Sequence, residues 1–227
     1  MKIAVTHHQM RNDAAEDASA LVEAARLACA SGADAIVCPR IPSFAALDPA
    51  ERETLLARIE GCAEGAALLV SFADDDTGPR VVESLLGRTA LLGGDACLRE
   101  KVLRTLVAEG VDTVVWRPGA ESELQAEAIL EYALECSPAL AGLLVVAECS
   151  GGEGQDGCRG TSAIIHAGEL VAEATGLGDE LLIAEVEVPI AAPEPSLLLP
   201  GLPPILAQRL AVHEGRKPPV DYLADLF

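Results

Sequence analysis

Short apolar stretches alternate with helical stretches from the start of the chain, and this alternation is what most constrains the fold. Lys2–Thr6 and Ala35–Cys38 have the composition of short buried strands, and Asn12–Ala30 between them carries apolar residues at helical spacing. A strand, a helix and a second strand joined in this way give two parallel strands, because the helix carries the chain back along the sheet. The chain is therefore predicted to be an α/β protein.

The same alternation continues to residue 188. Further helices are predicted at Pro49–Glu64, Ala96–Glu109 and Glu121–Cys136. Further strands are predicted at Ala67–Phe72, Arg80–Leu86, Arg88–Leu92, Val111–Trp116, Leu143–Ala147, Gly160–Ile165, Leu170–Ala174 and Leu181–Val188. No linker divides the chain, so one domain is predicted over residues 1–188. The proline-rich tail, residues 189–227 with a helical piece near Ile205–His213, is predicted to pack on this domain or across a dimer.

The charge balance excludes two classes of partner. The chain has 36 acidic and 16 basic residues, which gives a formal net charge of −20. A surface this acidic repels phosphate groups, so neither nucleic acid nor an anionic membrane is expected as a partner. No apolar run approaches the roughly 18 residues of a membrane span.

The seven cysteines indicate reduced thiols. Their number is odd, a chain of 227 residues needs no disulfides to fold, and no signal peptide is recognisable. A cytoplasmic location is therefore expected.

Neither a metal nor a cofactor is predicted. Cys149, Cys158, His166 and the His7-His8 pair are metal-ligand types, but their spacing matches no known metal motif. The loop Ser150–Gly160 is rich in glycine, yet a strand is predicted after it, and a phosphate-binding loop requires a helix there.

Three stretches resemble the nitrilase superfamily of carbon–nitrogen hydrolases. Ala33–Pro39 is similar to a strand motif of that family, and Leu91–Ala120 is similar to its nucleophile elbow with the helix and strand that follow. Gly160–Glu169 resembles a family hairpin, and Leu181–Val188 resembles the family's closing strand. The resemblance implies a four-layer αββα sandwich, which generally pairs into a dimer.

The resemblance also implies a chemistry that this chain lacks the residues to perform. Family members hydrolyse amides or nitriles with a cysteine nucleophile, a glutamate base and a lysine that stabilises the anionic intermediate. Arg40 stands at the glutamate position and Gly93 at the cysteine position, and no lysine occurs between Lys2 and Lys101. The interval from Arg40 to Gly93 is also short, which indicates that the lysine-bearing strand is deleted.

Several residues around the expected pocket have two interpretations. Arg40 is either a clamp for a carboxylate or, as favoured here, an ion-pair partner of Glu135 or Asp95. Gly93-Gly94 is either a backbone anion site or, as favoured, a tight turn in which Asp95 caps the next helix.

The remaining candidates are carboxylates and thiols. Glu135 resembles a second family glutamate, although a solvated helix residue is the favoured interpretation, and Glu148 is a further binding candidate. Cys97 and Cys38 are the alternative nucleophiles, and Cys97 is expected near a helix N-terminus that would lower its pKa. For both, a small buried apolar role is favoured.

These observations lead to two functional hypotheses. The first is an inactive nitrilase-like protein that binds a small ligand in the remnant pocket, or serves as a partner subunit in a homodimer or in a hetero-oligomer with an active relative. The alternative is a hydrolase of a non-peptide C–N bond, such as an amide or nitrile, with a rewired cysteine site.

Overall fold

The computed structural model describes residues 1–11, 13–63, 65–69, 79–151, 160–174, 178–187, 190 and 198–216. Some predictions fall outside these residues: Cys158, most of the loop Ser150–Gly160, the predicted strand beyond Leu69, and the tail apart from residues 190 and 198–216. The predicted element ends Asn12, Glu64 and Val188 also lie outside them.

The first sheet contains the N-terminal strands in the order β11-β1-β2-β3. Its members are β1 (Lys2–Gln9), β2 (Ala35–Val37), β3 (Ala67–Leu69) and β11 (Glu180–Glu185). The strands β1, β2 and β3 are parallel, and β11 runs antiparallel to β1. The two-residue strand β8 (Cys149–Ser150) extends alongside the end of β1. The parallel pairing predicted from the first strand-helix-strand unit is thus present.

The second sheet has the order β10-β9-β7-β6-β5-β4. Its members are β4 (Arg80–Ser84), β5 (Gly87–Gly93), β6 (Thr113–Arg117), β7 (Leu143–Val146), β9 (Ala163–His166) and β10 (Glu169–Glu173). The central strands β5, β6 and β7 are parallel. The hairpin between β9 and β10 turns at Ala167 and Gly168, which both have positive φ.

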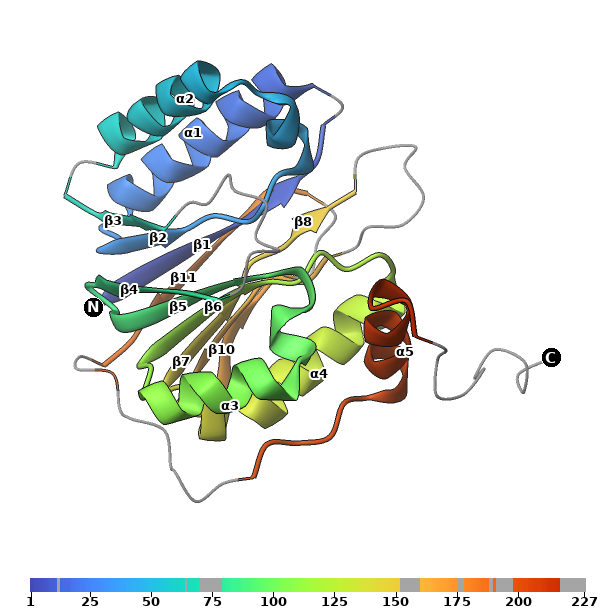
Figure 1. Cartoon of the computed structure of the whole chain (residues 1–227). Coiled ribbons are helices and arrows are strands. Elements are labelled where there is room, and N and C mark those ends of the chain that lie inside the picture. The colour runs from blue at the N-terminus through green and yellow to red at the C-terminus, as the bar shows by residue number, and fades with distance from the viewer. Residues whose placement is uncertain are drawn as a thin grey trace.

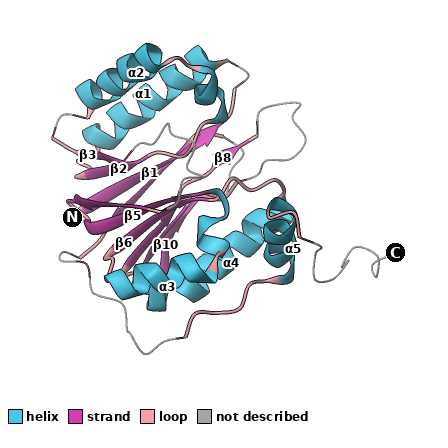
Figure 2. Cartoon of the chain, viewed as in Figure 1, coloured by secondary structure: helices cyan, strands magenta, loops and turns pink. Residues whose placement is uncertain are grey.

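Helices cover the outer face of each sheet, which produces four layers (Figures 1 and 2). The helices α1 (Ala14–Ala30) and α2 (Pro49–Cys62) cover the first sheet. The helices α3 (Glu100–Glu109) and α4 (Glu123–Leu140) cover the second. The structure is therefore the predicted αββα sandwich.

The core between the sheets is aliphatic. Alternate residues of β1 point to opposite sides: Ile3 and Val5 pack against the second sheet, whereas Ala4 packs under α1 and α2. From the second sheet, Val115 and Val145 join the cluster between the layers. This core fixes the register of the strands whose ends form the site described below.

Two predicted helix boundaries were wrong. The segment Ala96–Glu109 forms a 3-10 helix, η3 (Gly94–Leu98), followed by α3, with Arg99 in extended backbone between them. The helix predicted to end at Cys136 continues to Leu140, past Pro138. The Ser137 hydroxyl donates to the Leu134 carbonyl at 3.2 Å and so supplies a bond that the proline nitrogen lacks.

The tail contributes the helix α5 (Pro204–His213), which packs against α4 and η3 of its own chain. Leu206 and Leu210 are buried in the same core cluster as α3 and α4. Among the described residues, no helix has both the length and the apolarity that a membrane crossing requires.

Candidate functional site

A cavity of about 460 Å³ lies at the carboxyl ends of β2, β5 and β6. In α/β sheets, ligands generally bind at this edge, where the loops that follow parallel strands meet. The described residues that line the cavity are Arg40, Gly93, Gly94, Asp95, Ala96, Arg99, Val102, Pro118, Gly119, Glu121, Arg209 and His213. The structure therefore brings together Arg40, Gly93, Gly94 and Asp95, four of the residues predicted from the sequence.

The turn after β5 forms one wall of the cavity. Gly93 ends the strand, and Gly94 begins η3 with φ +49, a conformation that disfavours side chains. The indole N–H of Trp116, on the neighbouring strand β6, donates to the Gly94 carbonyl at 3.0 Å. The turn is thus held by β6 and presents backbone to the cavity at both glycines.

Asp95 does not cap a helix, contrary to the prediction. It is buried, and one carboxylate oxygen accepts from Arg209 Nε at 2.8 Å while the other contacts His213 Nδ1. The helix η3 has no side-chain cap. The local sequence pattern failed because the partners of Asp95 are 114 and 118 residues away in α5.

Arg209 of α5 binds the turn after β5 through Asp95. It was not predicted as a site residue. Besides Asp95, its guanidinium donates to the Pro118 carbonyl at 2.5 Å and to Gln125 Oε1 at 3.3 Å. Its side chain is only 4% exposed, so these contacts satisfy a buried cation. The only signal in the sequence was an arginine within the largely apolar segment Pro204–His213.

Glu148 is buried behind the cavity wall. Its carboxylate accepts from the backbone N–H groups of Gly119 and Ala120, just after β6. Burial raises the pKa of Glu148 to about 7, although the two N–H groups and the nearby Arg209 act in the opposite direction. Glu148 thus supports the loop that lines the cavity rather than lining it.

The open part of the cavity carries an excess of positive charge. Arg40 is exposed, and the Arg99 side chain is 46% exposed and lies 3.5 Å from Glu214. Three arginines line the cavity, against the two carboxylates Asp95 and Glu121. In a chain with a net charge of −20, this local excess of cations is a departure from the rest of the surface.

A buried arginine joins the ends of the two sheets beneath Arg40. Arg117 ends β6, and its guanidinium donates to the carbonyls of Cys38 at 2.9 Å and Leu69 at 3.0 Å. Cys38 directly follows β2 and Leu69 ends β3, and both strands belong to the other sheet. The contacts fix the two walls of the cavity relative to each other.

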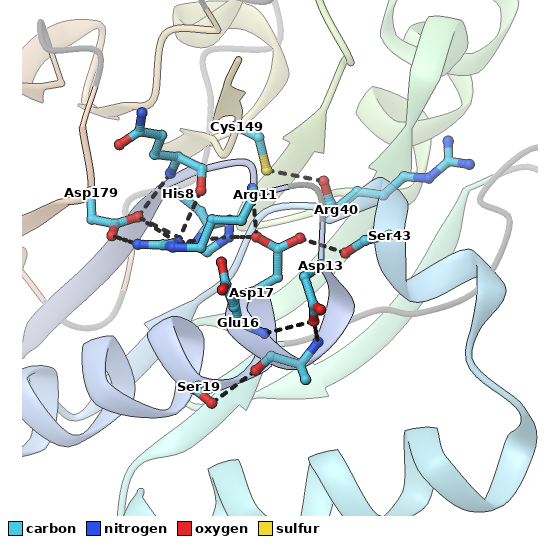
Figure 3. Close-up of polar contacts among 12 residues, drawn as sticks. His8, Arg11, Asp13, Glu16, Asp17, Ser19, Arg40, Ser43, Cys149 and Asp179 are labelled. Carbon is cyan, nitrogen blue, oxygen red and sulfur yellow. Dashed lines mark hydrogen bonds and ion pairs between the residues drawn. The ribbon is translucent and has the colours of Figure 1, made fainter. Parts of the chain in front are cut away.

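A second polar network, which was not predicted, holds the segment that follows Arg40 (Figure 3). The fully buried Asp17 of α1 accepts from His8 Nε2 at 2.8 Å, from the Arg11 backbone N–H at 2.8 Å and from the Ser43 hydroxyl at 2.6 Å. Ser43 belongs to η1 (Pro42–Ala46), the 3-10 helix that follows Arg40. Asp17 therefore ties this segment to α1.

The outer side of the network is closed by Asp179. Its carboxylate accepts from the Gln9 N–H at 2.8 Å and pairs with the Arg11 guanidinium. Burial is the largest single influence and opposes ionisation, but the hydrogen bonds from Arg11 and the Gln9 N–H and the nearby charges of His8 and Arg11 together outweigh it, so the pKa of Asp179 is lowered. Figure 3 shows the Arg40 side chain extending away from this network, while the Arg40 carbonyl accepts from the Cys149 thiol at 3.2 Å.

The candidate nucleophiles do not reach the cavity. Cys97 is 2% exposed and Cys38 is fully buried. Burial raises the pKa of the Cys38 thiol to about 11 and raises that of Cys97 well above its usual value. The prediction that a helix N-terminus lowers the pKa of Cys97 is therefore wrong. The short helix η3 lies in apolar surroundings and does not offset the loss of solvent around the thiol.

Two further sets of predicted residues lie elsewhere. Glu135 is exposed on α4 and is not among the described residues of the cavity lining. Within the described part of the chain, no group of three or more His, Cys, Asp or Glu side chains is arranged to hold a metal ion. The His7 ring contacts the Ser162 hydroxyl at 2.9 Å, and burial lowers the pKa of His7.

Comparisons with known proteins identify the fold. No protein-family model and no curated protein sequence matches the chain. Solved structures of an amidase of the nitrilase superfamily from Nesterenkonia sp. AN1 match with TM-scores of 0.65 to 0.66. One is a glutamate-to-glutamine variant with acrylamide added to its active-site cysteine, a second is a cysteine-to-serine variant, and a third is a cysteine-to-alanine variant in complex with butyramide.

These three matches are each 20% identical in sequence to this chain. They cover 82% of this chain and 90% to 93% of the amidase chains. The chain thus has the fold of a nitrilase-superfamily amidase over nearly the whole length of that enzyme.

Proposed function

We propose that this protein is a catalytically inactive relative of the nitrilase-type amidases and that its cleft binds a small carboxylate. The observation that carries the proposal is the cavity lining, which contains the exposed Arg40 after β2 and the exposed Arg99 between η3 and α3, and no thiol among the described lining residues. An acyl-enzyme mechanism needs a nucleophile at this place, whereas an arginine fork is suited to a carboxylate.

Arg40 and Arg99 are the residues proposed to contact the ligand. Both side chains are exposed at the cavity, and the contact of Arg99 with Glu214 involves its Nε. Arg209, by contrast, is buried and donates to Asp95, Gln125 and Pro118. Arg209 is therefore assigned a positioning role.

The balance of charges favours a singly charged ligand. Three arginines face two carboxylates in the lining, and Glu214, which lies beside Arg99, is itself paired with Arg216, so an excess of about one positive charge remains. A carboxylate neutralises such an excess, whereas a phosphate dianion overcompensates it.

The rewired-hydrolase alternative has less support. It requires a thiol that reaches substrate and ionises near neutral pH, and burial acts against both for Cys38 and Cys97.

The Nesterenkonia amidase structure that holds butyramide suggests a matched pair of probes. Butyramide and butyrate share their shape but differ in charge.

The proposal is tested by titration calorimetry of the protein with butyrate, butyramide and phosphate. Butyrate is expected to bind and butyramide is not, because only the carboxylate accepts bidentate bonds from arginine. In the Arg99→Gln and Arg40→Gln variants, the affinity for butyrate is expected to fall at least about tenfold, since a hydrogen bond to a charged group contributes about 1.5–3 kcal/mol.

Arg26→Gln serves as the matched control. Arg26 is an exposed arginine of α1 that pairs with Glu23 on the outer layer. Its removal is expected to leave butyrate binding unchanged. Ammonia release from butyramide, or equal binding of all three probes, would overturn the proposal.

A further inference from the structure

An apolar groove of about 620 Å³ adjoins the cavity, between the start of α4 and one face of α5. Glu121, Arg209 and His213 line both the groove and the cavity, so the two hollows are contiguous. Each has a volume typical of a small-molecule site.

The groove gains its apolar character from both helices. Ile205 and Val212 lie on the same face of α5 as Arg209, at positions i, i+4 and i+7. Leu124 faces them from the first turn of α4. Leu124 is 65% exposed and Val212 is 58% exposed, so large apolar side chains border the groove with much of their surface in contact with solvent.

The polar and apolar parts meet along α5. Ile205 and Val212 line only the groove, whereas Arg209 and His213 line both hollows and His213 contacts Asp95 in the cavity. A ligand that fills both parts must carry its charge at one end and its apolar part at the other.

We infer that the ligand is an amphipathic monocarboxylic acid, with its carboxylate at Arg40 and Arg99 and an alkyl or acyl chain along the groove between α4 and α5. The inference rests on the proposed function and adds the chemical class of the ligand. Continuity of the groove with the cationic cavity selects this occupant, because the charge of the cavity fixes which end of the ligand enters it.

The test is a calorimetric series with butyrate, hexanoate and octanoate, with octanamide as the neutral control. Burial of one methylene tightens binding about fourfold, so each step of two carbons is expected to lower the Kd roughly fifteenfold. In the double variant Leu124→Ser/Val212→Ser, the dependence on chain length is expected to vanish while butyrate binds as before.

A third exposed leucine provides the control for this variant. Leu85 is 56% exposed in the β4–β5 turn, away from the groove, and Leu85→Ser is expected to preserve the full dependence on chain length. Leu85, Leu124 and Val212 are each more than half exposed, so their substitution is expected to change the free energy of unfolding little.

The possible failures are distinguishable. Equal Kd values across the series would overturn the inference and leave the proposed function standing, whereas no binding of any carboxylate would overturn both. If dependence on chain length appears only in a chain ending at Arg216, residues 217–227 occupy the groove and the inference is wrong. It is equally wrong if Leu124→Ser/Val212→Ser converts a dimer into monomers, because a second copy then covers the groove.

Discussion

At the scale of single residues, one buried carboxylate joins the turn after β5 to the C-terminal helix. Asp95 is bound by Arg209 and by His213, and Arg209 is itself buried. A buried ion pair of this kind contributes little over an apolar pair, but the loss of one partner leaves a desolvated charge. Asp95 is therefore expected to be more important for the integrity of the cleft than for ligand contact.

Asp95→Asn tests this role. The substitution leaves Arg209 without its anionic partner, so the free energy of unfolding is expected to fall by roughly 3 kcal/mol, measured by urea denaturation. Glu121→Gln, in which an exposed carboxylate of the same cavity is neutralised, is expected to change it by less than about 0.5 kcal/mol. Equal small effects of both variants would show that Asp95 is not a structural anchor.

A second residue-scale prediction concerns pH. Because burial raises the pKa of Glu148 to about 7, the folded protein retains a proton that the unfolded chain releases above its ordinary pKa of 4.5. The folded state is therefore destabilised progressively as pH rises from about 4.5 to 7, by roughly 3 kcal/mol in all. Below pH 4.5 both states are protonated and the effect disappears.

The Glu148→Gln variant has no such proton to release. We therefore compare the free energies of unfolding of the variant and the native protein at each pH, measured by denaturation. The difference, variant minus native, is expected to increase by roughly 3 kcal/mol between pH 4.5 and pH 8. A difference that stays constant over this range would mean that Glu148 ionises normally in the folded protein.

At the scale of elements, α5 completes the cleft although it belongs to the proline-rich tail. Leu206 is fully buried in the core cluster of α3 and α4, and the same helix carries Arg209 and His213 to the cavity. The packing of α5 on the core thus places two of the residues that line the cavity.

Leu206→Ala is expected to lower the free energy of unfolding by about 3 kcal/mol, because it leaves a cavity under α5. The variant is also expected to bind butyrate more weakly, because Arg209 is held less firmly. Leu198→Ala is the control, since Leu198 is 89% exposed, and should affect neither quantity. Thermal denaturation and calorimetry on the two variants check both expectations, and unchanged butyrate binding in a destabilised Leu206→Ala protein would separate α5 from the site.

The elements were largely predictable because their signals are local. Apolar periodicity within α1 and β2 needs no knowledge of partners, and the four layers follow from the order of the elements. The interior of the site was not predictable in the same way. The contact of Asp95 with Arg209 and that of Asp179 with Arg11 each join segments more than one hundred residues apart, and no local pattern encodes them.

Some of the predicted site residues nevertheless lie together in the structure. Arg40 and Gly93 lie 53 residues apart in the sequence and line one cavity, as expected if parallel strands bring their carboxyl ends together. The boundary between η3 and α3 was missed because Arg99 interrupts a continuous helical pattern, and the length of α4 was missed because Ser137 compensates for Pro138.

At the scale of the whole molecule, the resemblance predicts a dimer in a chain that is strongly acidic. Two copies with a net charge of −20 each repel one another, so association is expected to weaken at low ionic strength. Light scattering coupled to size exclusion is expected to give twice the 23.5 kDa chain mass in about 0.15 M salt. A mass of 23.5 kDa at every salt concentration would contradict the predicted pairing.

The proposed function requires the absence of thiol catalysis in a fold shared with an amidase, of which a glutamate variant adds acrylamide at its active-site cysteine. The most direct measurement is intact-mass spectrometry of the native protein during incubation with acrylamide at neutral pH, with peptide mapping of any adduct. If the protein is inactive, no cysteine is labelled faster than the same cysteine in the unfolded chain, and butyrate leaves the labelling rates unchanged. Rapid addition of one acrylamide to a single cysteine, blocked by butyrate, would contradict the proposed function.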